Sequence, residues 1–328
     1  MNIGQNVRTG INNMPFRNDF VLSLDSSVPE FDPTFCRTYA DVTDQRCHDL
    51  LQSHSHRPWI IAWSGGIDST TVVASLYKNL NAQQLSNVTV ALNHLSVYEN
   101  PVFYQRVVRP HFQTILITDL PRGNDHYVIS GHLNDQLCPG GFVPFAMASR
   151  ELGANNIFQK PDALINFISR LTDPDFAVWF YEHKIENIQS TGLPIHTYDQ
   201  FWWWMFFNHM WVCLKWSGEI SGRSMIPWFD TPDYQQWAMH RNLTAPAHRG
   251  FENFKLDSKR YIFGIDGNHD YLRFKTKFHS SGLASHVAMN PVMSEPNTVL
   301  AWLDDDRVLT APHDTAELLT MLPDHINI

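Results

Sequence analysis

A short loop of sequence SGGIDS contains the groups needed to bind a phosphate. Gly65 and Gly66 allow backbone N–H groups to approach an anion closely. The hydroxyl groups of Ser64 and Ser69 are further donors. Asp68 would repel a phosphate on its own, but its carboxylate would bind a Mg²⁺ ion placed between the two. The residue types therefore predict a site for a metal-bound phosphate.

The segments on either side of this loop predict a strand and a helix. Residues 59–63 (WIIAW) form a short apolar run, which is typical of a buried strand. Residues 70–77 (TTVVASLY) can continue as a helix. A phosphate in the loop would then lie at the N-terminus of that helix, where the helix dipole favours an anion. An ordinary Ser/Gly turn that leads into a helix is the alternative interpretation.

A second polar segment, residues 130–137 (SGHLNDQL), follows a predicted strand at residues 126–130. The carboxyl ends of parallel strands meet at one edge of a sheet, so we expect Asp68 and Asp135 to lie close together. Two such carboxylates could hold Mg²⁺ on a bound phosphate. Taken alone, the segment is equally typical of a polar loop at the end of a strand.

Short β-rich runs alternate with helical segments in the first half of the chain, and longer helical stretches follow. This alternation predicts an α/β fold with a doubly wound parallel sheet and a helical C-terminal half. The expected strands are residues 59–63, 88–93, 114–117 and 126–130, and the expected helices are residues 37–53, 70–77, 101–110, 161–171, 176–189 and 198–216.

The expected organisation has three parts. Residues 1–57 are an N-terminal arm and lead-in, with a strand at residues 20–24. Residues 58–145 are the α/β core that carries the loop, and residues 146–328 are a mainly helical substrate-side region packed on the same domain. Near the C-terminus, an acidic turn predicts a hairpin followed by a short helix.

Composition excludes several classes of protein. A formal net charge of −9 over 328 residues disfavours a broad electrostatic contact with nucleic acid, although it allows a local basic groove. The four cysteines form no CxxC pair, which argues against a structural zinc site or a dithiol redox motif.

The N-terminus has no signal-peptide pattern. The apolar residues 201–216 are too few to cross a bilayer and predict a buried aromatic helix. A cytoplasmic protein without a membrane partner is expected.

The SGGIDS loop resembles the pyrophosphate loop of the N-type ATP pyrophosphatases, the PP-loop superfamily. Members of that family cleave ATP between the α- and β-phosphates, adenylate a carboxylate or carbonyl oxygen, and retain pyrophosphate in the loop. The resemblance implies ATP and Mg²⁺ as cofactors. It places the nucleotide on Ser64, Gly65, Gly66, Asp68 and Ser69, with Gly131 at the second segment, and it makes Asp68 and Asp135 the metal ligands.

The second segment is similar to that of asparagine synthetases and β-lactam synthetases, which have Ser-Gly-acid-Gly-x-Asp-Glu-Leu and then Gly-Gly-aromatic. Asp135 matches the second metal-binding aspartate of that pattern. The acid after Ser-Gly is His132 here, and the glutamate is Gln136. In asparagine synthetases the first acid lies where the attacking amine arrives. His132 could accept a proton there, it could mark a different acceptor, or it could be a structural histidine.

Two later segments resemble the same family in the same order. Residues 221–230 resemble Glu-x-Arg-x-Pro-Phe-Leu-Asp, which makes Arg223 a candidate catalytic residue that would either line the site or be structural. Residues 273–278 resemble a late Arg-x-x-Lys-x-x-Phe segment, in which a lysine covers the phosphates and the charge of the acyl-adenylate. Lys275 is the better match for that catalytic lysine, and Lys277 is the second choice.

The resemblance implies an AMP-forming ligase that adenylates a small-molecule carboxylate and transfers the acyl group to ammonia or an amine. The asparagine synthetases also have an N-terminal glutaminase domain, and the 57 residues before the loop strand are too few for one. Nitrogen would then come from free ammonia, an amine substrate or a separate nitrogen-donor protein. The alternatives are adenylation of a nucleobase or tRNA oxygen before amination or thiolation, with Cys138 as the sulfur carrier, and a catalytically silent scaffold.

Overall fold

The structure is a computed structural model of the chain. It describes residues 29–121, 123–138, 152, 156–159, 161–170, 173–205, 207, 225–244, 255–273, 276–277, 298–302 and 308–312.

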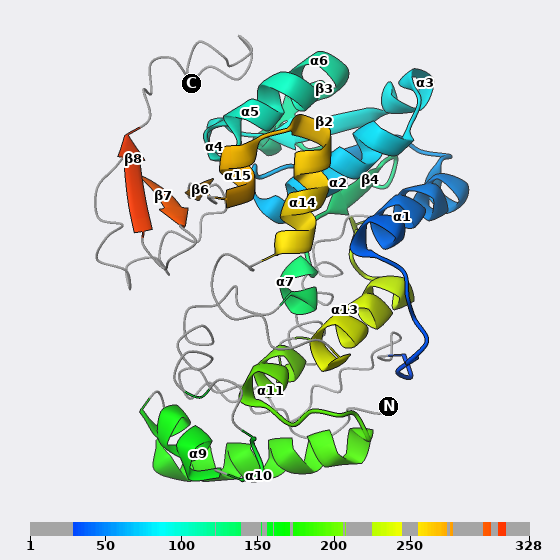
Figure 1. The fold of residues 1–328 in the computed structure, drawn as a ribbon. Coiled ribbons are helices and arrows are strands. Elements are labelled where there is room, and N and C mark those ends of the chain that lie inside the picture. The colour runs from blue at the N-terminus through cyan, green and yellow to red at the C-terminus, as the bar shows by residue number, and fades with distance from the viewer. Residues whose placement is uncertain are drawn as a thin grey trace.

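A five-stranded parallel sheet is the centre of the fold (Figure 1). Its order is β3-β2-β1-β4-β5, and every neighbouring pair is parallel. The predicted α/β class is confirmed, and both ends of each of the four predicted strands agree with the structure to within one residue. The fifth strand comes from the second half of the chain. The sheet therefore contains strands from both expected parts, residues 58–145 and residues 146–328. The strands are β1 Trp59–Ala62, β2 Val88–Leu92, β3 Gln113–Leu116, β4 Tyr127–Ser130 and β5 Met225–Pro227.

The central strands are apolar because both of their faces are covered. Ile61 of β1, Val90 of β2 and Ile129 of β4 are completely buried. They lie side by side, since Ile61 pairs with Val90 on one side and with Ile129 on the other. A continuous apolar run, without alternation, is what a parallel sheet buried on both faces requires.

Three helices pack against one another in front of the sheet in Figure 1: α1 (Tyr39–His54), α2 (Ile67–Asn79) and α14 (Leu256–Asp266). Helix α1 begins with a capping box in which Thr38 and Asp41 satisfy each other's backbone N–H groups. Helix α14 is distant in sequence, yet it lies directly against α2. A residue at the start of α14 can therefore reach the loop before α2.

The connection from β2 to β3 is helical, as predicted for residues 101–110, but it is broken into short pieces. Helices α4 (His94–Glu99) and α5 (Pro101–Phe103) lead into a π-helical turn at Tyr104–Val108, which continues as α6 (Arg109–His111). A 3₁₀ turn at Ile117–Asp119 follows β3.

The remaining helices belong mostly to the second half of the chain. The predicted helices at 161–171 and 176–189 are confirmed, and the one at 198–216 is confirmed as far as Met205. Trp202, Trp203 and Trp204 are buried, in agreement with a packing role for this aromatic stretch. These helices are α3 Ala82–Leu85, α7 Asn134–Leu137, α9 Pro161–Ser169, α10 Pro174–Thr191, α11 Tyr198–Met205, α13 Pro232–Thr244 and α15 His269–Arg273.

A small antiparallel sheet contains the expected C-terminal hairpin. Strands β7 (Thr298–Trp302) and β8 (Val308–Pro312) pair with each other, and β6 (Thr276–Lys277) pairs with β7. The acidic turn, the expected terminal helix and the expected strand at residues 20–24 lie outside the described residues. Within the described ranges, no helix combines the length and the apolar character needed to span a bilayer.

Candidate functional site

The two polar segments singled out in the sequence meet at one place in the sheet. From β1 the chain proceeds to β2 and β3 on one side, and it later returns to β4 on the other side of β1. The loops after β1 and β4 therefore flank the point at which the strand order reverses. In open α/β sheets, ligands bind in the crevice at the carboxyl ends of the strands at such a point.

The two glycines of the loop after β1 have different roles. Gly65 has a φ of +78°, and a Cβ there would lie 2.2 Å from the carbonyl oxygen of Ser96. Gly66 precedes α2, and it has no side chain that could accept a hydrogen bond from the first turn of that helix. Helix α2 therefore has no side-chain cap at its N-terminus. A bound anion could accept hydrogen bonds from the free N–H groups of its first turn instead.

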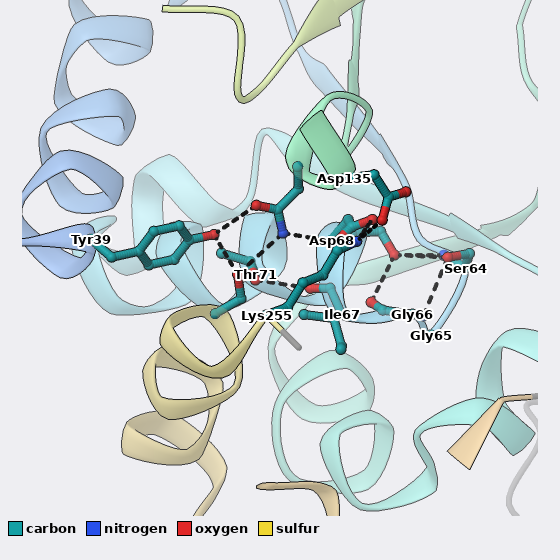
Figure 2. A network of polar contacts seen from close by, with 12 residues as sticks. Tyr39, Ser64, Gly65, Gly66, Ile67, Asp68, Thr71, Asp135 and Lys255 are labelled. Carbon is teal, nitrogen blue, oxygen red and sulfur yellow. Dashed lines mark hydrogen bonds and ion pairs between the residues drawn. The ribbon is translucent and has the colours of Figure 1, made fainter. Parts of the chain in front are cut away.

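The two serines of the loop close it by hydrogen bonds. The Ser69 hydroxyl accepts from the backbone N–H of Ser64 at 3.0 Å, and the two hydroxyl groups lie 3.0 Å apart. The Ser64 hydroxyl also accepts from the N–H of Gly66 at 3.3 Å. The two serines therefore bond to each other across the glycine turn and hold its shape (Figure 2), and their role in binding a phosphate stays a prediction.

Two hydroxyl groups, those of Tyr271 and Thr70, fix the position of the loop by donating hydrogen bonds to the carbonyl oxygen of Gly65. This oxygen accepts from the Tyr271 hydroxyl at 3.2 Å and from the Thr70 hydroxyl at 3.3 Å. The indole N–H of Trp63 donates in turn to Thr70. Burial raises the pKa of the Tyr271 phenol well above its ordinary value, so this donor remains protonated.

Gly131 explains how the second segment comes so close to the first. A Cβ at Gly131 would lie 2.6 Å from the backbone nitrogen of Ser69 and 2.7 Å from the carbonyl carbon of Asp68. The end of β4 thus rests on the backbone of the first turn of α2. Only glycine, which has no Cβ, can make this contact without a steric clash. The contact brings the following helix, α7, against Asp68.

Asp68 and Asp135 converge on a lysine that the sequence analysis did not select. The Nζ atom of Lys255 lies 2.5 and 2.6 Å from the two carboxylate oxygens of Asp68. It also lies 2.5 Å from Oδ1 of Asp135. Figure 2 shows the three side chains meeting beside the loop. The predicted proximity of the two aspartates is thus confirmed, with an ammonium group between them.

The electrostatic balance keeps Lys255 charged. Its side chain is only 2% exposed, whereas those of Asp68 and Asp135 are 25% and 50% exposed. Burial alone lowers the pKa of the ammonium, but the neighbouring carboxylates outweigh it and raise the pKa above its ordinary value. One ammonium and two carboxylates leave the cluster with an excess negative charge on its exposed side.

The backbone at Lys255 is constrained as well. Lys255 precedes the first residue of α14 and has a φ of +49°, a left-handed conformation that costs a residue with a Cβ roughly 1–2 kcal/mol. Such conformations persist where the surroundings determine them. Here the surroundings are the packing of α14 on α2 and the ion pairs of the side chain.

Asn134 is a second functional candidate that the sequence analysis missed. Its buried amide donates to Oδ1 of Asp68 at 2.8 Å and to the hydroxyl of Ser258 at 3.1 Å. Its Oδ1 accepts from the Tyr39 hydroxyl at 3.3 Å, and Ser258 donates to the same hydroxyl at 2.7 Å. This network ties Asp68 to helices α1, α7 and α14.

The other predicted site residues are placed less completely. His132 is exposed in the turn between β4 and α7. Arg223 and Lys275 lie outside the described residues, and Lys277 is described only as part of the backbone of β6. Cys138 is buried, and burial raises the pKa of its thiol to about 12.

The residues present fit Mg²⁺ only in part. Asp68 and Asp135 provide oxygen ligands that converge, as Mg²⁺ requires, and Mg²⁺ is usually held by one or two carboxylates together with substrate phosphates. The described part of the chain holds no group of three or more His, Cys, Asp or Glu side chains that could bind a metal without such phosphates. The ammonium of Lys255 lies at the point of convergence.

The sheet order 3-2-1-4-5 with flanking helices is consistent with a Rossmann-like α/β fold. The position of the two loops at the reversal of strand order agrees with the ligand sites of such folds. Comparisons of the chain with models of protein families, with curated proteins and with solved structures give no match.

Proposed function

We propose that this protein is an ATP-dependent, AMP-forming ligase that adenylates a carboxylate and transfers the acyl group to ammonia or an amine. The observation that carries this proposal is the meeting of Asp68, Asp135 and Lys255 beside a glycine loop at the N-terminus of α2. The resemblance of both loops to those of the PP-loop ATP pyrophosphatases, and of the asparagine synthetases among them, gives the reaction class.

In this proposal the loop and the charged cluster have separate tasks. The backbone N–H groups of the loop and the N-terminus of α2 bind the pyrophosphate part of ATP. Asp68 and Asp135 would hold Mg²⁺ together with the phosphates, and the bound ion would supply positive charge for the pyrophosphate. Lys255 is the cation that can stabilise negative charge on the α-phosphate and on the acyl-adenylate.

The reaction has two steps. A carboxylate oxygen of the substrate attacks the α-phosphorus, the bond from that phosphorus to the bridging oxygen breaks, and pyrophosphate leaves. The nitrogen of ammonia or an amine then attacks the carbonyl carbon of the acyl-adenylate, AMP leaves, and the nitrogen loses a proton. His132 is exposed in the turn that leads to α7 and is our candidate to accept that proton.

The thiolation alternative finds less support. A sulfur carrier must be accessible and must form a thiolate readily. Cys138 is 1% exposed, and the pKa of its thiol is raised to about 12. Its environment is that of a structural cysteine.

Release of AMP and pyrophosphate from ATP tests the proposal. The protein is incubated with MgATP and pools of carboxylic acids, with and without ammonium or amines, and both products are measured. Asp68→Asn should abolish product formation, and circular dichroism shows whether the variant is folded after losing the buried ion pair with Lys255. Asp49→Asn, which changes an exposed aspartate of α1, should not abolish product formation. Intact turnover in Asp68→Asn would overturn the proposal, and no turnover with any pool would favour the scaffold alternative.

A further inference from the structure

We infer that Lys255 and the divalent cation compete for Asp68 and Asp135, so that the metal enters this site only together with the nucleotide. This inference rests on the proposed function. It adds an order to the binding of the ligands: the bare metal ion is excluded, and the metal–nucleotide complex is the species that the site accepts.

The geometry places the ammonium where a bridging metal ion would lie. Three carboxylate oxygens, two from Asp68 and one from Asp135, are within 2.6 Å of Nζ of Lys255. Mg²⁺ binds oxygen at about 2.0–2.1 Å, so a metal ion shared by the same oxygens would overlap the ammonium group. A metal ion bound by the carboxylate of Asp135 alone would still lie close to the positive charge of Lys255.

The ammonium cannot simply leave the carboxylates. Lys255 is 2% exposed, and removing a buried cation from its counter-ions without a new partner is costly. A free Mg²⁺ ion provides no such partner, because it brings only positive charge. The phosphates of a nucleotide do provide one, and they would arrive on the side where the carboxylates are exposed.

The side chain can exchange partners while the backbone stays in place. Lysine has four rotatable bonds and carries its charge at the tip, so a modest movement of Nζ is enough. Helix α14 is held on α2, and the hydrogen bond from Lys259 N to Lys255 O fixes its first turn. Metal and nucleotide therefore support each other's binding, because the phosphates remove the competitor of the metal.

Binding of Mn²⁺ without nucleotide tests this inference, with free Mn²⁺ measured by electron paramagnetic resonance. Wild type is compared with Lys255→Met and with Arg260→Met. The latter removes one exposed positive charge from the same helix and controls for the change in net charge. Lys255→Met should bind Mn²⁺ at least roughly tenfold more tightly than wild type, within the usual range of coupling between ligands. Arg260→Met should bind Mn²⁺ as wild type does.

The added affinity must come from the two aspartates. The double variant Lys255→Met/Asp135→Asn should lose it. Equal Mn²⁺ affinity in wild type and Lys255→Met would overturn the inference, and so would a gain that survives Asp135→Asn. Circular dichroism shows whether Lys255→Met is folded.

If Lys255→Met does not fold, a comparison of the wild-type protein with Asp135→Asn tests whether Lys255 excludes the metal ion. Its Mn²⁺ affinity without nucleotide should be no higher than that of Asp135→Asn, because Lys255 already blocks the site. A clearly higher affinity would overturn the inference. These measurements involve no turnover. The competition could therefore hold in a protein that releases no pyrophosphate, and it could fail in one that does.

Discussion

Gly131 gives the sharpest test of how the two loops are held together. In Gly131→Ala the new Cβ would lie 2.6 Å from Ser69 N and 2.7 Å from Asp68 C, against an ordinary contact of at least 3.4 Å. The end of β4 and the first turn of α2 must therefore separate by about 0.8 Å. Both partners are backbone, so no flexible side chain can move aside.

This separation should affect stability and activity together. Overpacking of a rigid contact costs typically about 1–3 kcal/mol, and we expect the upper half of that range. Asp135 moves with α7, so its carboxylate would shift relative to Asp68 by a similar distance. A misplacement of roughly 1 Å in a catalytic site can lower kcat about 100-fold.

The assays are urea denaturation for the free energy of unfolding and pyrophosphate release for kcat. Gly264→Ala is the matched control: it lies in α14, where a Cβ would meet nothing within 4 Å. It should stabilise the helix by about 0.5–1 kcal/mol and leave kcat unchanged. If Gly131→Ala were as stable and as active as wild type, the proposed contact between β4 and α2 would be refuted.

Three further outcomes are expected. Asn134→Ala removes the amide from a buried network and should lower the free energy of unfolding by about 1–3 kcal/mol in urea, whereas an unchanged midpoint would contradict the network. Burial lowers the pKa of Lys184 to about 8, so the folded state releases its proton before the unfolded state does. Stability should therefore rise between pH 8 and 9.5, by about 1 kcal/mol after allowance for partial exposure, and Lys184→Met should lose that rise. Peptide mapping after brief treatment with a thiol reagent should show label on exposed Cys36 and none on buried Cys47 or Cys138, and early label on Cys138 would revive the thiolation alternative.

Local sequence patterns were sufficient to predict four of the five strands and the glycine turn after the first of them. Residues 59–63 are apolar without a break because β1 is buried on both faces, and Gly65 and Gly66 follow where the chain must turn tightly. The position of Asp135 near Asp68 followed from one rule, since parallel strands end at the same edge of a sheet. These predictions needed no knowledge of distant contacts.

Lys255 and Asn134 could not be found in this way, because their roles depend on packing. A single lysine before a helix has the same local pattern as many solvated lysines, and only the contact between α14 and α2 places it at the aspartates. Strand β5 is three residues long, which is too short to produce a clear period in the sequence. The predictions for Arg223 and Lys275 depended on the resemblance of two short segments to a family pattern, and they remain predictions.

The left-handed backbone at two site residues indicates that tertiary contacts determine the position of the cluster. Leu133, just before α7, has a φ of +82°, and Lys255, just before α14, has a φ of +49°. Each conformation is unfavourable for a residue with a Cβ. Leu133 lies directly before α7, in which Asn134 donates to Asp68, and Lys255 is itself the residue that reaches Asp68. Neither turn would form by local preference. Asp68 therefore meets its partners because Gly131 admits α7 and because α14 packs on α2, and a change at either contact should affect the charged cluster before it affects the sheet.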